Sequence, residues 1–509
     1  MILVDFITDF SPRPIAAPNT SLAELLGELD ARNTTLALST SRRGLLNQVN
    51  SEAIAETLDC SAGHPRLLPV GTLDPRRYLG WREDLRRCVE GGCVAIRFAP
   101  GAQRWSPDIL LFEKMIEAIG GVKLPVIVDC DGGGVEVSTW IQRLAATTRR
   151  HGVSVVINEL GYQWTGELLT VMHEYPNVYA SIRKLALVGS LENAVAEGLG
   201  ERFVFGSCAP QHSTRALLNH VLMARISGQV KEAILAGNAL RLLGLEGERL
   251  PVAALPIDTR VELPAKPIVD VHAHVGGFSL PQPDDLCDRS TVPEMSEKCN
   301  IELTIVSSYL AINYDMRAGN AQTQSFLKRY ASLRGYVVVD ARDIPGSVEQ
   351  MEHYFADSRF VGVKLYCPFS GNMAARNTQE LLDEVARFGR PVKIHMDEGG
   401  SPYPGVRRAA ENNPDLVIIK AHGDDIEGAR QVEDLANVYF EFCSSGISPG
   451  KIRRAADALG VERILFGTDQ QLFAPWYQLG AYLDAIKDED EAERIFRRNP
   501  RRIFDLGID

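Results

Sequence analysis

The sequence predicts an α/β protein built from two tandem (β/α)8 barrels. Three observations support this fold class: a length of 509 residues, an internal repeat that joins the two halves, and short aliphatic runs that alternate with longer amphipathic stretches. This length suits two domains of about 250 residues. Buried parallel strands alternating with helices over such a length are typical of a barrel, and a doubly wound sheet is the alternative.

The repeat keeps its order and spacing in both halves. AEGLGERFVFGSC at 196–208 matches ADALGVERILFGTD at 456–469, LPVIVDC at 124–130 matches RPVKIHM at 390–396, and VAIRF at 94–98 matches VGVKLY at 361–366. Measured from Ile7, positions 97, 129 and 208 lie 90, 122 and 201 residues on; from His272, positions 364, 395 and 469 lie 92, 123 and 197 residues on. A spacing held over this distance indicates a tandem duplication.

The repeat sets the expected domains: a barrel over 1–250, a linker over 251–265 and a second barrel over 266–509. The segment 246–267 has four prolines and no helical period, a composition typical of a linker. In the second half, the expected strands are ELTIVSS at 302–308, YVVVD at 336–340, VGVKLY at 361–366, VKIHM at 392–396, LVIIKAH at 416–422, VYFEF at 438–442 and ILFGTD at 464–469. Amphipathic stretches such as SPGKIRRAADALG at 448–460 separate them.

Composition excludes several classes of partner. A net charge of −12 argues against nucleic acid, which needs a basic surface. No run of eighteen apolar residues predicts a membrane span, and the N-terminus does not read as a signal peptide. Nine dispersed cysteines without CxxC pairs indicate thiols in a reducing cytoplasm. We therefore expect a cytoplasmic protein with a small-molecule substrate, packing of one barrel on the other and, as a further option, a homo-oligomer.

Histidines gather at the predicted strand ends of the second half. His272 and His274 lie two apart at the end of one strand, so both imidazoles point to the same face. His395, His422 and Asp469 end three later strands. Neutral imidazoles with a carboxylate suit a first-row divalent ion, so we expect one metal ion, zinc in the first place and manganese as the alternative.

On these residues, 266–509 resembles the amidohydrolase superfamily, specifically the amidohydrolase-2 group of metal-dependent hydrolases and decarboxylases with a TIM-barrel fold. The likeness includes VDVHAH at 269–274, the strand-end motifs around His395 and His422, FGTD at 466–469 and the closing RNPRRIF at 498–504. The resemblance implies a metal held by His272, His274, His395 and Asp469. It also implies that Asp469 and His422 are catalytic, Asp469 as a proton acceptor and His422 in orienting or deprotonating water or in polarising the substrate.

Three further residues are candidates for binding substrate: Lys364, Arg342 and Tyr366. In binuclear relatives a strand-four lysine is carboxylated and bridges two ions, but GVKL at 362–365 resembles the non-bridging form, which favours one ion. Arg342 and Tyr366 lie near strand ends, where they could meet a substrate carboxylate. Arg342 has a counterpart in Arg76, which weakens its functional case. Asp397 and Glu398 are interpreted as solvated loop carboxylates, with a place lining the mouth of the barrel as the alternative.

The first half lacks the ligands. The positions of His272 and His274 hold Ile7 and Asp9, and those of His395, His422 and Asp469 hold Asp129, Leu160 and Cys208. We expect a barrel that kept its fold and lost its metal site, with an ion on Asp9, Asp129 and Cys208 as the less favoured alternative. Its expected roles are to pack against the catalytic barrel, shape its entrance or replace a homodimer partner. Gly132–Gly134 are interpreted as a turn, with an anion cradle as the alternative.

The expected activity is hydrolysis of a C–O or C–N bond, in a lactone, ester or amide of a small carboxylated molecule. Non-oxidative decarboxylation is the alternative, because the resembled group runs both reactions on nearly the same ligands; the intact His272–His274 pair favours hydrolysis. A non-catalytic metal-binding scaffold is a second alternative, and the retention of His422 and Asp469 argues against it. The loops at 275–296, 309–322, 367–375 and 470–477 carry no recognisable code, so the substrate stays open.

Overall fold

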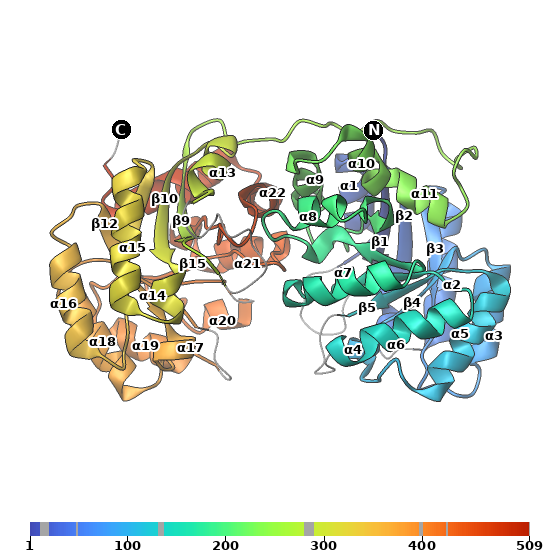
Figure 1. Cartoon of the computed structure of the whole chain (residues 1–509), viewed down its shortest axis with the longest axis horizontal. Helices are drawn as coiled ribbons and strands as arrows, with labels where there is room; N and C mark the ends of the chain where they lie inside the picture. The colour runs from blue at the N-terminus through green and yellow to red at the C-terminus, as the bar shows by residue number, and fades with distance from the viewer. Residues whose placement is uncertain are drawn as a thin grey trace. The chain divides into compact units, whose positions relative to one another are not determined.

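The computed structural model divides the chain into two compact units, Met1–Val261 and Glu262–Asp509. Figure 1 shows strands and surrounding helices in each unit. The boundary falls inside the stretch predicted to be a linker. The structure describes residues 1–10, 20–46, 49–130, 137–278, 290–396, 401–423 and 426–507. Asp397, Glu398 and Gly132–Gly134 lie outside these ranges, so the interpretations given to them stay predictions.

Each unit is an eight-stranded parallel sheet in which every strand pairs with the next along the chain. The ends of each sheet also meet: Phe6 N donates to Phe205 O at 2.7 Å in the first unit, and Val271 N donates to Phe466 O at 3.0 Å in the second. The prediction of two tandem (β/α)8 barrels is therefore confirmed. The strands are β1 Leu3–Phe10, β2 Thr34–Ser41, β3 Leu67–Thr72, β4 Ala95–Phe98, β5 Val126–Asp129, β6 Val155–Asn158, β7 Val178–Ser181, β8 Phe203–Val204, β9 Ile268–Val275, β10 Ile301–Ser308, β11 Leu333–Val339, β12 Phe360–Tyr366, β13 Val392–His395, β14 Ile418–Lys420, β15 Val438–Glu441 and β16 Ile464–Leu465.

Helices follow the strands and lie around each barrel. Local signals start several of them: Ser21 and Glu24 form a reciprocal capping box on α1, and Asp315 caps α15. The first unit has α1 Leu22–Ala31, η1 Arg42–Leu45, α2 Asn50–Gly63, α3 Trp81–Glu90, α4 Pro100–Gln103, α5 Leu110–Val122, α6 Val137–Arg150, η2 Tyr162–Trp164, α7 Thr165–Glu174, η3 Ile182–Lys184, α8 Ser190–Ala196, η4 Gly200–Arg202, α9 Thr214–Met223, α10 Gly228–Glu232, η5 Ala233–Gly237 and α11 Asn238–Leu242. The second has α13 Val292–Lys298, α14 Tyr309–Asn313, α15 Met316–Arg329, α16 Ile344–Tyr354, α17 Cys367–Ser370, α18 Arg376–Ala386, α19 Tyr403–Asn412, α20 Ile426–Arg430, α21 Pro449–Leu459, η6 Val461–Arg463, α22 Pro475–Ala485, α23 Glu489–Glu493, η7 Arg494–Arg498 and α24 Asn499–Phe504.

The units share irregular features as well as their topology. Each ends in an α-helix interrupted by a π-helical turn, η5 in one and η7 in the other. After that turn, the side-chain amide of Asn238 donates to Gly200 O and Phe203 O, and the amide of Asn499 donates to Val461 O and Ile464 O. These shared irregularities agree with the duplication inferred from the repeat.

A buried carboxylate joins the first strand to the segment after the last strand in both barrels. Asp5 accepts hydrogen bonds from Ser207 N at 2.9 Å and Ser207 Oγ at 2.5 Å. Asp270 accepts from Thr468 N at 3.1 Å and Thr468 Oγ at 2.5 Å. Burial raises the pKa of Asp5 and of Asp270 to about 7, although these hydrogen bonds act to lower it. Because both barrels have this clamp, it belongs to the fold.

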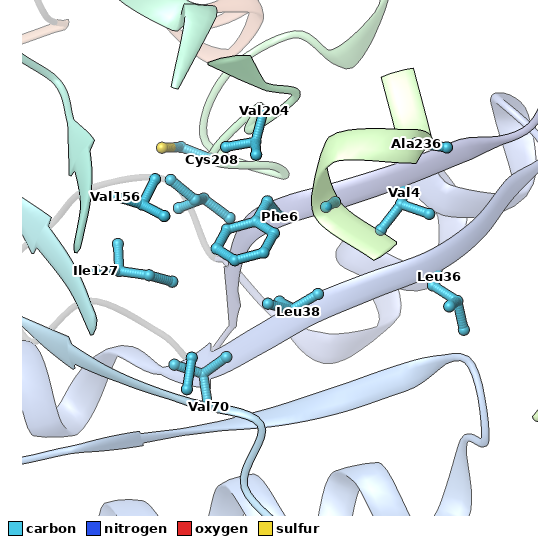
Figure 2. Close-up of a cluster of buried hydrophobic side chains, with 13 residues drawn as sticks. Val4, Phe6, Leu36, Leu38, Val70, Ile127, Val156, Val204, Cys208 and Ala236 are labelled. Atoms are coloured by element: carbon cyan, nitrogen blue, oxygen red, sulfur yellow. The ribbon is translucent and has the colours of Figure 1, made fainter. Parts of the chain in front are cut away.

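Apolar side chains fill the interior of the first barrel. Figure 2 shows Phe6, Ile127, Val156 and Val204 in one cluster, together with Cys208. Ile7 also belongs to this cluster. Two positions that match predicted metal ligands of the second barrel, 7 and 208, are therefore part of an apolar core here.

No helix within the described ranges is long and apolar enough to cross a membrane.

Candidate metal centre

Three predicted ligands meet at the carboxyl end of the second barrel. His272 and His274 lie on the same face of β9 and are 1% and 4% exposed. Asp469 follows β16, and its backbone N donates to His272 O at 2.7 Å, which places its side chain beside both imidazoles. Asp469 Oδ1 lies 3.1 Å from His274 Nε2 and 3.7 Å from His272 Nε2. One ligand atom from each of the three residues lies within 4.8 Å of the other two.

The hydrogen bonds at Nδ1 turn the other ring nitrogen of each histidine toward this centre. His272 Nδ1 lies 2.5 Å from Glu441 Oε1, and His274 Nδ1 lies 3.1 Å from Ser307 Oγ and 3.3 Å from Ser307 O. A proton held at Nδ1 leaves the lone pair on Nε2, the form that binds a metal. Two imidazole nitrogens and a carboxylate oxygen therefore fit a divalent ion such as Zn²⁺ or Mn²⁺.

The charge states also suit a metal. Burial, with the nearby positive charge of Lys364, holds the pKa of His272 and of His395 well below the usual value, and burial lowers the pKa of His274. Burial alone would raise the pKa of Asp469, but its close contact with His274 and nearby positive charges, including that of Lys364, lower it. At neutral pH the imidazoles are neutral and the carboxylate is ionised, as metal binding requires.

His395 lies beside this group. It ends β13, and its ring centroid is 4.6 Å from that of His422 and 4.7 Å from that of Tyr366. Among the described residues, the cluster of ligand atoms around Asp469 holds His272 and His274 and does not include His395. The structure thus brings three of the four predicted ligands together, and coordination by His395 stays a prediction.

A second group of possible ligands also contains His272. It adds His422, Glu441 and Cys443, again with ligand atoms within 4.8 Å of one another. His272 Nδ1 already meets Glu441, His422 Nδ1 lies 2.6 Å from Cys443 O, and burial raises the pKa of the Cys443 thiol well above its usual value. A protonated thiol and occupied nitrogens are poor ligands, so this group supports the histidines instead of holding an ion.

The predicted substrate-binding residues lie in different surroundings. Lys364 is buried, with Nζ 3.2 Å from His272 Nε2, and burial with the charge of Lys393 lowers its pKa to about 7. Tyr366 lies at the site through its contact with His395. The Arg342 side chain is 61% exposed and forms a 2.6 Å ion pair with Asp340. Arg76 pairs in the same way with Asp74, so both arginines brace their own loops.

The amidohydrolase family model (Amidohydro_2) matches residues 38–245 and 269–506, one segment in each barrel.

The chain belongs to the amidohydrolase family.

No curated protein matches this amidohydrolase. Solved structures match one barrel at a time. 2,6-Dihydroxybenzoate decarboxylase from Rhizobium is 14% identical, with a TM-score of 0.40, over 47% of this chain and 99% of its own. A putative amidohydrolase from Staphylococcus aureus is 13% identical, with a TM-score of 0.41, over 48% and 100%. A probable 2-pyrone-4,6-dicarboxylic acid hydrolase from Acinetobacter baumannii is 16% identical, with a TM-score of 0.34, over 47% and 99%.

Strand register corrects one residue in the alignment of the two barrels. In the first barrel, Asp129, which matches His395, pairs with Asn158. In the second barrel, Ile394 pairs with Lys420, so His395, the next residue, stands opposite the residue that follows Lys420. The counterpart of His422 is therefore Glu159, and the prediction of Leu160 was wrong by one position. Backbone conformation agrees, because Glu159 and His422 have φ angles of 60° and 55°, in the left-handed region that residues other than glycine rarely adopt.

Charged residues replace the histidines in the first barrel. Asp9 lies 2.8 Å from Arg42 and 3.4 Å from Arg97, and Arg97 Nε lies 2.9 Å from Asp129. Arg183 and Glu159 form a further ion pair. We call these three arginines and three carboxylates the ion-pair cluster; its members are Asp9, Arg42, Arg97, Asp129, Glu159 and Arg183. The arginines neutralise the carboxylates, and the possible metal groups within the described ranges all lie in the second barrel.

The sequence interpretation missed the role of Glu441 and Lys393. Both are completely buried, and Glu441 Oε1 lies 3.2 Å from Lys393 Nζ. The repeat contained a signal for them, because their counterparts in the first barrel are the uncharged Ser181 and Ile127. Where one copy has a charged residue and the other an uncharged one, the barrel fold itself does not require the charge.

Proposed function

We propose that the second barrel is a metal-dependent hydrolase that cleaves a C–O or C–N bond, in a lactone, ester or amide of a small carboxylated molecule. The observation that carries the proposal is the convergence of His272, His274 and Asp469 at the strand ends, with His422 and Lys364 around them. The first barrel, without imidazoles at these positions, has the supporting role.

A divalent ion held by His272, His274 and Asp469 would act as a Lewis acid and lower the pKa of water at the site. Asp469 is an ionised, buried carboxylate whose Oδ1 faces both histidines. It is therefore placed to accept a proton from the attacking water and return it to the leaving group.

His422 acts as a second proton acceptor. Its Nδ1 proton is held by Cys443 O, so its Nε2, 3.1 Å from His395 Nδ1, has the lone pair. In the structure this lone pair accepts from His395 Nδ1, which leaves the Nε2 lone pair of His395 for the ion. His422 is proposed to take a proton from water at Nε2 in exchange for that hydrogen bond. Lys364 and Tyr366, which lie at the same strand ends, are proposed to bind the substrate carboxylate. Arg342 is exposed and forms an ion pair with Asp340, and its part in substrate binding stays a prediction.

The proposal is tested by following acid and carbon dioxide together. Protein loaded with zinc or with manganese is incubated with a panel of small carboxylated lactones, esters and amides, and with carboxylated aromatics. Acid released from lactones or esters, or amine released from amides, without carbon dioxide supports hydrolysis. Carbon dioxide released in step with substrate loss would overturn it in favour of decarboxylation, and no turnover of any compound would favour the scaffold. Asp469→Asn is the inactive control, and Cys208→Ala, at the matched position of the first barrel, should keep full activity.

A further inference from the structure

We propose that Glu441 and Lys393 form a positioning pair that holds His272 in the tautomer and orientation a metal needs. The pair acts on the metal site of the proposed function and therefore rests on it. Glu441 ends β15, and its Oε1 lies 2.5 Å from His272 Nδ1. Lys393, on β13, has Nζ 3.2 Å from the same oxygen. Three strands of the barrel thus meet at one buried carboxylate oxygen.

Lys393 also holds the backbone beside the ligand. Its Nζ donates to Val271 O at 2.8 Å, and Val271 directly precedes His272. The pair thus fixes the ring through Nδ1 and the adjoining strand through the carbonyl. An imidazole held at both points presents Nε2 toward Asp469 without having to be ordered when an ion arrives.

Stability of the fold alone does not explain the pair. Both side chains are 0% exposed, and Glu441 Oε2 is buried without a hydrogen-bond partner among the described residues. Removing two charges and an acceptor from water costs free energy that the ion pair does not reliably return. Their presence at the centre of this barrel is explained by His272, which Glu441 contacts directly and which Lys393 reaches through Glu441 and Val271 O.

The first barrel shows the same fold without the pair. The strand pairings Val155 with Val178 and Ile418 with Val438 align β7 with β15, so Ser181 stands at the position of Glu441. The pairings of β4 with β5 and of β12 with β13 place Ile127 at the position of Lys393.

The ligand position changes together with the pair, since Ile7 replaces His272. A Cβ on Gly467 would lie 2.7 Å from Glu441 Oε2 and 3.0 Å from His272 Cβ, and one on Gly206 would lie 3.0 Å from Ile7 and from Ser181. In both barrels a glycine lies close to the side chains of the first and seventh strands. Only in the second barrel are these side chains a carboxylate and an imidazole. The charged pair therefore accompanies the metal ligand and not the barrel fold.

The test replaces Glu441 and Lys393 with the residues at the matching positions of the first barrel. The double variant Glu441→Ser/Lys393→Ile removes both charges together, which avoids leaving one charge unpaired in the core. Zinc affinity is measured by competition with a chromophoric chelator, and the thermal midpoint of the metal-free protein is measured alongside. We expect the midpoint to stay within a few degrees and the affinity to fall by about 10- to 100-fold. Glu441→Gln, whose amide oxygen can still accept from Nδ1, should recover part of that loss.

Each other outcome has a definite meaning. Unchanged zinc affinity in the double variant would overturn the positioning role while leaving the proposed function intact. A metal-free double variant that does not fold would also overturn it, by showing that the pair serves the barrel. Wild-type protein that binds neither zinc nor manganese would refute the proposed function, and the role of the pair with it. Ser181→Ala in the first barrel is the matched control and should leave zinc affinity unchanged.

Discussion

Individual histidines of the second barrel have separable tasks. His272 and His274 direct Nε2 toward Asp469, whereas His422 meets Cys443 O through Nδ1 and His395 through Nε2. We propose the first two as ligands and His422 as a proton acceptor. We therefore expect single substitutions to change metal content and turnover independently.

Substituting His422 should reduce turnover and spare the metal. His422→Asn is expected to keep about one zinc ion per chain while kcat falls by roughly 10²- to 10⁴-fold, the usual contribution of a positioned proton acceptor. His272→Asn should lose both metal and activity. Elemental analysis and steady-state kinetics on the two variants provide the check, and loss of metal from His422→Asn would place that residue among the ligands instead.

The clamp at Asp5 should make the stability of the first barrel depend on pH. Its folded-state pKa of about 7 is above the unfolded value of 3.8, so its contribution is complete at low pH and is lost as the pH rises through 7. Between pH 5 and pH 8, wild type should lose roughly 2–3 kcal/mol relative to Asp5→Asn, which does not titrate. Urea unfolding followed by tryptophan fluorescence reports on this barrel, because four of the five tryptophans lie in it. Equal pH dependence in the two proteins would show that Asp5 is ionised throughout.

The sequence indicated the candidate ligands more clearly than the residues around them. His272, His274 and Asp469 were predictable because strand periodicity and the repeat place each of them at a strand end. Lys393 lies inside β13 and Glu441 ends β15, both strands that read as aliphatic, and only pairing across three strands shows what the two side chains contact. The counterpart of His422 was missed by one residue because the turn after β6 has no distinctive sequence, whereas its register is fixed by hydrogen bonds.

At the scale of elements, the two barrels have different kinds of side chain at the same strand ends. The second barrel gathers imidazoles around one carboxylate, and the first gathers the ion-pair cluster from the ends of β1, β2, β4, β5, β6 and β7. The sequence predicted the strands and their order, because each is a short aliphatic run followed by an amphipathic helix. It did not predict the cluster, since arginines far apart in the chain show no spacing that joins them to particular carboxylates.

Breaking the ion-pair cluster should destabilise the first barrel only. Arg97 is buried between Asp9 and Asp129, so Arg97→Met leaves two carboxylates short of a partner. The expected loss is about 3–5 kcal/mol in urea unfolding followed by tryptophan fluorescence, with zinc content unchanged. Arg342→Met, at an exposed arginine, is the control and should change stability by less than about 0.5 kcal/mol. A loss of bound zinc in Arg97→Met would mean that the first barrel contributes to the metal site.

At the scale of the whole molecule, a duplicated barrel has kept its fold in both copies and its imidazole site in one. The closing hydrogen bonds, the Asp5 and Asp270 clamps and the π-helical turns recur in both units, while the strand-end residues differ. The barrel interior and the strand ends are separate sets of residues, so one can change without the other.

Zinc should therefore stabilise one barrel and leave the other unchanged. In calorimetry of the metal-free protein, saturating zinc is expected to raise one thermal transition, by an amount equivalent to about 4 kcal/mol at a thousand times the dissociation constant. The transition reported by tryptophan fluorescence, which follows the first barrel, should stay in place. A shift in that transition instead would assign the ion to the first barrel.

The central claim is one metal site per chain, formed by the second barrel alone. Elemental analysis of purified protein tests it most directly, on wild type and on the double variant His272→Asn/His274→Asn. We predict about one zinc or manganese ion per wild-type chain and none in the variant. Two ions per chain, or one ion retained by the variant, would contradict the account.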